Sequence, residues 1–149
     1  MTKLQELYEK LEKYSDFTEE DNIEKFLDTI DEVLLKKDPS SIKEILKYCR
    51  EDCEYDIITE SLPQSVLYLL DEEGVQHFLP CIKDFFRRCP SFCEEVVSIL
   101  FNTKEDCEFF RQNMYLANKT SLLELFDLMK KKSPHHKELI TELRAELNH

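Results

Sequence analysis

Apolar residues recur three and four positions apart along most of the chain, which is the spacing of helices that bury one face. Clear stripes run from Leu4 to Tyr14, from Ile23 to Leu34 and from Leu139 to Leu147. The pattern predicts about nine helices separated by short connections.

Residues that favour helix N-termini mark where these helices begin. A Ser or Thr followed three residues later by an acidic residue forms a capping box, and proline suits the first helical turn. The predicted starts are Thr2, Thr18, Ser41 with Glu44, Thr103 with Asp106, Ser121 with Glu124, and Ser133 followed by Pro134. Pro63 is expected to kink or shorten a helix from about residue 53 to 70, and residues 71–74 to separate it from a helix over about 75–89.

Composition supports an all-α fold. The chain has 149 residues with one Gly and five Pro, whereas hairpins need glycine-rich turns. We expect a single all-helical domain over residues 1–149. Helix starts near residues 41, 74, 103 and 134 recur every 29–33 residues, and those near 18, 54 and 91 recur every 36–37, as in helical-repeat proteins. This spacing favours antiparallel hairpins stacked as a short HEAT/armadillo-like solenoid, with an irregular bundle as the alternative.

The net charge of the chain lies entirely in its first half. Residues 1–73 carry 9 Lys and Arg against 21 Asp and Glu, and residues 74–149 carry 11 against 11. Such a field attracts cationic partners and repels nucleic acid and anionic membranes. From this charge we expect a basic protein as partner, without nucleic acid or membrane. Neither a signal peptide nor a membrane-spanning stretch is visible, so we expect a cytoplasmic protein.

Catalytic motifs are absent from the sequence. One glycine excludes a glycine-rich phosphate loop, and no nucleophile motif occurs, so we expect no enzyme and no cofactor. The adjacent histidines His135 and His136 are expected to be exposed, because they follow a proline at a helix start. The pairs Cys49/Cys53 and Cys89/Cys93 have helical spacing, which favours reduced thiols packed in the core and leaves a zinc site as the alternative.

The candidate partner-binding residues are acidic residues and tyrosines on an acidic surface of the second to fourth helices and just beyond. Amphipathic aromatic residues beside carboxylates suit an interface that captures Lys and Arg. Acidic residues at helix N-termini also stabilise the helix dipole, so capping competes with binding as their role. The candidates are Glu51, Asp52, Glu54, Tyr55, Asp56, Glu60, Tyr68, Asp71, Glu72 and Glu73.

Three motifs within residues 50–102 carry a family resemblance. They are Cys53-Glu54-Tyr55-Asp56, then Cys89-Pro90-Ser91-Phe92, and finally Ser98-Ile99-Leu100-Phe101-Asn102. This stretch resembles the thirtieth immunity-protein family of bacterial polymorphic-toxin systems. The resemblance implies a helical cytosolic protein that binds and neutralises a cognate toxin, without catalysis or a cofactor. It assigns no site residues and leaves the oligomeric state open. The alternative is a helical-repeat adaptor between proteins, with no toxin partner.

Overall fold

The computed structural model describes residues 2–148, and every regular element in that range is a helix, as the sequence predicts. The residues form two compact units, of which the first ends at Leu69 and the second begins at Leu70. Each unit has its own buried apolar residues. No helix within residues 2–148 is both long and apolar enough to cross a bilayer.

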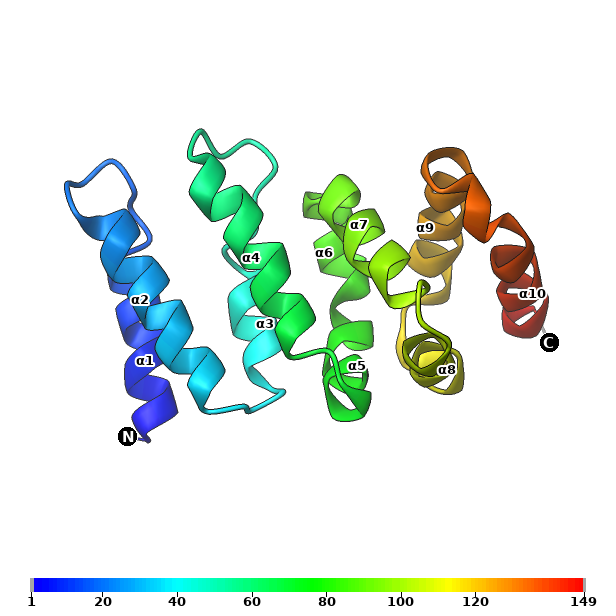
Figure 1. Cartoon of the computed structure of the whole chain (residues 1–149), viewed down its shortest axis with the longest axis horizontal. Helices are drawn as coiled ribbons and strands as arrows, with labels where there is room; N and C mark the ends of the chain where they lie inside the picture. Colours follow the sequence, from blue (N-terminus) through cyan, green and yellow to red (C-terminus); the bar gives the residue numbers. More distant parts are fainter. Residues whose placement is uncertain (1, 149) are drawn as a thin grey trace. The chain divides into compact units, whose positions relative to one another are not determined.

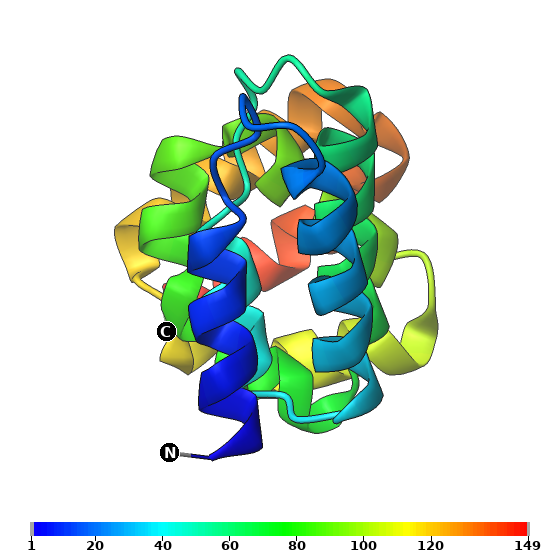
Figure 2. The same ribbon diagram turned by 90° about the vertical axis from the view of Figure 1, so that its left-hand side faces the viewer.

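The N-terminal unit consists of two helical hairpins. Its helices are α1 (Lys3–Lys13), α2 (Asn22–Leu35), α3 (Ser41–Leu46) and α4 (Asp56–Tyr68). Helix α1 packs on α2, α3 packs on α4, and α2 packs on α4. Within this unit α1 and α3 form one layer and α2 and α4 the other, and the α1–α2 and α3–α4 connections lie at the same end (Figures 1 and 2). The predicted antiparallel hairpins are therefore present here.

The C-terminal unit is built around α9. It contains α5 (Glu72–Phe78), η1 (Leu79–Cys81), α6 (Ile82–Arg88), α7 (Pro90–Leu100), α8 (Lys104–Asn113), η2 (Met114–Leu116), α9 (Lys119–Lys132), η3 (Pro134–His136) and α10 (Lys137–Leu147). Helix α9 packs on α6, α7 and α10, while α5 packs on α8. Its fully buried side chains include Phe78, Phe85, Phe110 and Phe126.

Two of the predicted helix caps are confirmed. The Thr2 hydroxyl accepts from the Gln5 N–H, and the Gln5 side chain accepts from the Thr2 N–H at 3.0 Å, which completes a capping box before α1. The Thr103 hydroxyl accepts from the N–H of Asp106 at 3.3 Å before α8. In both cases the cap is local, so sequence alone identifies it.

Other predicted caps are wrong, because a neighbouring side chain or a tertiary contact takes over. The α9 cap is Asn118, which accepts from the Ser121 N–H at 3.0 Å, so the predicted box with Glu124 does not form. Ser41 is buried and hydrogen-bonds Tyr8 instead of capping α3. Thr18 lies in a turn, and α2 begins four residues later.

Two prolines act differently from each other. Pro63 lies inside α4, which continues through it to Tyr68. Pro80 lies in the 3₁₀ segment η1, which divides the helix predicted over residues 75–89 into α5 and α6. The predicted break at residues 71–74 is shorter than expected, because Asp71 caps α5 and the helix starts at Glu72.

A buried polar network joins α7 to the segment before α10. The Ser133 hydroxyl donates to Glu94 Oε1 at 2.7 Å and lies 3.0 Å from Ser98 Oγ. The Nε2–H of His136 donates to the carbonyl oxygen of Ser98 at 3.2 Å. Ser133 therefore serves this network, and η3 intervenes before α10. The expectation that both histidines are exposed is wrong for His136, which is 7% exposed, whereas His135 is exposed.

We expect His136 to make stability depend on pH. Burial lowers the pKa of His136 from 6.5, the neighbouring His135 lowers it further, and the hydrogen bond to Ser98 opposes this. The unfolded chain then binds a proton more readily than the folded chain, so this contribution is present above about pH 6.5 and is lost as the pH falls below it. Urea unfolding at about pH 7.5 and about pH 5.5 measures this drop in the free energy of unfolding.

In the variant His136→Gln, the free energy of unfolding should fall less between about pH 7.5 and about pH 5.5 than in the parent chain. This holds whatever the stability of the variant at about pH 7.5. The control His77→Gln, at an exposed position, should leave the drop unchanged. An equal drop in His136→Gln and in the parent chain would contradict the assignment.

Candidate functional site

The connection between α1 and α2 is held by hydrogen bonds around Asp16. Its Oδ1 accepts from the Thr18 N–H at 3.1 Å and from the Thr18 hydroxyl at 2.6 Å. These bonds lower the pKa of the exposed Asp16 carboxyl. The Asn22 side chain donates to the Asp16 carbonyl oxygen at 2.8 Å. The segment is a defined turn, and it presents Asp16 as a carboxylate at neutral pH.

The second connection, between α3 and α4, is also acidic. Glu51, Asp52 and Glu54 are exposed there, whereas Cys53 and Tyr55 are half-buried. The Cys53 thiol donates to the Tyr55 carbonyl oxygen at 3.9 Å, and Tyr55 has extended backbone before α4 begins. The side chains therefore alternate between solvent and the unit, with the carboxylates outside.

Edge-to-face aromatic contacts join the two connections through the core. Phe17 contacts Tyr55 with ring centroids 6.2 Å apart, and it contacts Phe26 of α2 at 5.1 Å. Phe26 is fully buried and contacts Tyr48 at 5.3 Å. Such T-shaped pairs contribute about 0.5–1.5 kcal/mol each beyond their burial. We call Tyr55, Phe17, Phe26 and Tyr48 the aromatic chain.

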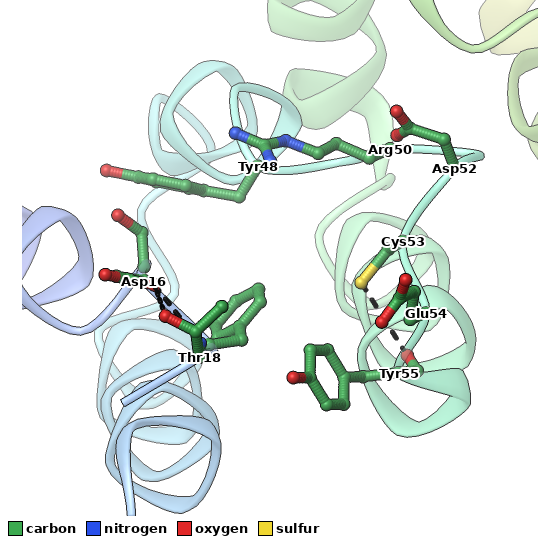
Figure 3. Close-up of a pocket in the computed structure, with 10 residues that line it drawn as sticks. Asp16, Thr18, Tyr48, Arg50, Asp52, Cys53, Glu54 and Tyr55 are labelled. Carbon is green, nitrogen blue, oxygen red and sulfur yellow. Dashed lines mark hydrogen bonds between the residues drawn. The ribbon is translucent and has the colours of Figure 1, made fainter. Parts of the chain in front are cut away.

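A cleft of about 570 Å³ opens between the two connections. Residues 15–18 line one side, and residues 48, 50 and 52–55 line the other. Asp16 and Thr18 lie opposite Cys53, Glu54 and Tyr55 (Figure 3). Three members of the aromatic chain (Phe17, Tyr48 and Tyr55) line the cleft beside the carboxylates of Asp16, Asp52 and Glu54. Arg50 adds one cation to the lining. The cleft therefore offers aromatic faces and negative charge together.

Two further hollows follow the junction of α1 with α3. One of about 420 Å³ is lined by Tyr8, Glu9, Glu12, Ser15, Glu44, Lys47 and Tyr48. It shares Ser15 and Tyr48 with the cleft. The other, of about 470 Å³, is lined by Gln5, Tyr8, Glu9 and Glu44. The Tyr8 and Ser41 hydroxyls, 2.7 Å apart, fix α1 beside α3.

The tyrosines of these hollows lie in a negative field. Burial raises the pKa of the Tyr48 hydroxyl above 10.0, and the carboxylates of Glu12 and Glu44 raise it further. Burial also raises the pKa of Tyr8, against the hydrogen bond with Ser41. Lys47 offsets part of the charge, because its ammonium group donates to both carboxylate oxygens of Glu44 at 2.9 Å.

Three of the predicted site residues line the cleft, namely Asp52, Glu54 and Tyr55. Glu51 lies in the same connection, and Asp56 and Glu60 are exposed on the first turns of α4. Tyr68 is 60% exposed but ends α4, about 18 Å along the helix from Asp56. The structure therefore separates Tyr68 from the cleft.

Asp71, Glu72 and Glu73 belong to the C-terminal unit. The Asp71 carboxylate accepts from the Gly74 N–H at 2.8 Å and caps α5, and the other two lie in its first turn. These positions favour negative charge through the helix dipole. Capping accounts for their location, and a binding role for them stays a prediction.

Several residues of the hollows were not among the sequence candidates. Phe17, Tyr48, Tyr8, Glu9, Glu12 and Glu44 line the hollows, as does Asp16, which the sequence shows only as part of an acidic connection. Glu44 and Tyr48 stand four apart, as do Tyr8 and Glu12, which places each pair on one helix face. That signal does not distinguish a groove from an ordinary solvent-exposed face. Only the placement of α3 beside α1 does so.

The cysteines occupy buried or half-buried positions. Cys49, Cys89 and Cys93 are buried, and Cys53, Cys81 and Cys107 are half-buried. Burial raises the pKa of Cys93 far above 9.0, which keeps this thiol protonated. Within residues 2–148, no group of three or more His, Cys, Asp or Glu side chains is placed to hold a metal ion.

Comparisons of the chain with protein-family models, with curated proteins and with solved structures found no match.

We expect the charge of Glu12 to act on Tyr48. The variant Glu12→Gln removes a negative charge that raises the pKa of Tyr48, so this pKa should fall but stay above its ordinary value because of burial. NMR titration of the labelled tyrosine ring carbons measures it. Glu6→Gln, on an exposed part of α1 outside the hollows, is the matched control. A Tyr48 pKa that is the same in both variants would show that Glu12 does not face it.

Proposed function

We propose that this chain is an immunity protein that binds a basic toxin and neutralises it by occluding the toxin's active site. The observation that carries the proposal is the cleft between residues 15–18 and 48–55, where carboxylates and aromatic rings face solvent together. The resemblance of residues 50–102 to an immunity-protein family also favours this role. The chain itself performs no catalysis in this role.

The distribution of charge supports a cationic partner. Residues 1–69, which hold the cleft, carry 9 Lys and Arg against 18 Asp and Glu, whereas residues 70–149 carry 11 against 14. The N-terminal unit therefore holds −9 of the net charge of −12. Complementary charge accelerates association and disfavours wrong partners, and salt weakens both effects.

To occlude an active site, the protein needs an acidic surface that fits the toxin. It also needs helices behind that surface that block access to the site. The carboxylates at residues 51–56 are exposed at the end of the N-terminal unit, and the aromatic chain holds their connection against α2. Where the toxin cleaves nucleic acid, carboxylates take the places of substrate phosphates. The helices behind the cleft then block access to the active site.

A protein adaptor without a toxin partner is the second candidate. The hollows between α1 and α3 favour it, because helical-repeat proteins bind partner segments along surfaces formed by successive helices. The two candidates share a basic partner and differ in whether binding protects a cell. Growth rescue therefore separates them.

Rescue of growth tests the proposal. Expression of the protein encoded immediately upstream should arrest growth, and coexpression of this chain should restore it. The variant Glu51→Lys/Asp52→Lys/Glu54→Lys/Asp56→Lys should abolish rescue and weaken binding at least about a hundredfold, since reversing each of the four charges replaces attraction by repulsion and costs about 0.7 kcal/mol or more.

The control Glu95→Lys/Glu105→Lys/Glu124→Lys/Glu138→Lys makes the same change of net charge at exposed positions of the C-terminal unit. It should retain rescue. Rescue by the first variant would refute the proposed surface. If this chain binds the upstream protein but neither protein affects growth, the adaptor role replaces the immunity role.

A further inference from the structure

The cleft and the two hollows adjoin one another, and together we call them the groove. The cleft shares Ser15 and Tyr48 with the hollow between α1 and α3, and that hollow shares Tyr8, Glu9 and Glu44 with the last one. The groove therefore runs from Gln5, along the side of α1 that faces α3, to Tyr55 at the start of α4. All of its residues belong to the N-terminal unit.

The lining of the groove is negative along its whole length. Six carboxylates line it, from Glu9, Glu12, Asp16, Glu44, Asp52 and Glu54, against the two cations Lys47 and Arg50. Lys47 is bound to Glu44, so its charge is already paired within the groove. Tyr8, Tyr48, Phe17 and Tyr55 lie between the carboxylates.

This alternation suits arginine more closely than any other side chain. A guanidinium group binds carboxylates through paired hydrogen bonds and stacks on aromatic faces, whereas lysine offers a point charge. Burial is the main cause of the raised pKa values of Tyr8 and Tyr48, and nearby carboxylates raise both pKa values further.

The length of the groove suits an extended segment. From Gln5 to Lys13, α1 rises about 12 Å at 1.5 Å per residue. An extended chain covers about 3.3 Å per residue, so about four residues of a partner segment span this length of α1. A partner segment of about eight residues therefore spans α1 and leaves about four residues to enter the cleft.

We propose that the groove seats an extended, arginine-rich segment of the partner protein. This inference deepens the proposed function and rests on it, because it names the part of the basic partner that enters the acidic site. The segment's arginines lie against Tyr8, Tyr48 and Tyr55 and pair with the carboxylates between them. The surrounding acidic residues at 51–56 then contact the body of the partner.

A synthetic octapeptide of alternating arginine and glycine tests the inference without the partner. We expect it to bind the full chain at least about tenfold more tightly than the corresponding tetrapeptide, measured by fluorescence anisotropy. It should shift the NMR signals of the Tyr8, Tyr48 and Tyr55 rings and leave Tyr68, at the far end of α4, unshifted. Equal affinity of the two peptides, or shifts confined to Tyr68, would overturn the extended segment.

Two variants of equal net charge locate the binding. Glu9→Lys/Glu12→Lys changes the groove, and Asp28→Lys/Asp31→Lys changes exposed positions of α2 outside it. The groove variant should lose at least about tenfold in affinity for the octapeptide and the α2 variant less than about threefold. Equal losses would mean that the peptide responds to net charge alone, which overturns the inference.

A neutral pair of variants removes net charge from the comparison. Tyr55→Ala should weaken the octapeptide severalfold, and Tyr68→Ala should not, with circular dichroism confirming that both fold. Peptide binding in the groove without growth rescue would refute the toxin role and keep the groove. Rescue that survives Glu9→Lys/Glu12→Lys, together with equal peptide losses, would refute the groove and keep the toxin role.

Discussion

The aromatic chain is the constraint on which the candidate site depends. Phe26 is fully buried on α2, and through Phe17 and Tyr48 it holds both connections of the N-terminal unit against the same core. Tyr55 continues this contact to the start of α4. Polar connections alone have no apolar driving force to stay in place. Because Phe17 and Tyr48 both pack on Phe26, the distance between the two acidic segments is fixed, and the cleft forms between them.

The carboxylates of this protein divide into two groups according to their surroundings. Asp71 caps α5, and Glu72 and Glu73 lie in its first turn, so helix formation accounts for their place. Asp16, Asp52 and Glu54 instead face a cleft beside aromatic rings. The net charge is therefore most informative where it lines the groove.

The sequence predicts the helices well and the site in part. Stripes and local caps such as Thr2 identify the helices, because both depend on residues close in sequence. Ser41 and Ser133 were predicted as caps but form long-range hydrogen bonds, which no local pattern reveals. In the same way, Asp52 to Tyr55 are visible as an acidic segment. Glu9 and Glu12 line a hollow only because α3 lies beside α1.

Hydrogen exchange of the full chain, alone and mixed with the protein encoded upstream, tests the central claim most directly. Amides whose exchange slows on binding mark the surface that the partner covers or steadies. The account predicts slower exchange in residues 5–18 and 44–56, with little change in residues 104–148. Slowing confined to residues 104–148, with residues 5–18 and 44–56 unchanged, would contradict it.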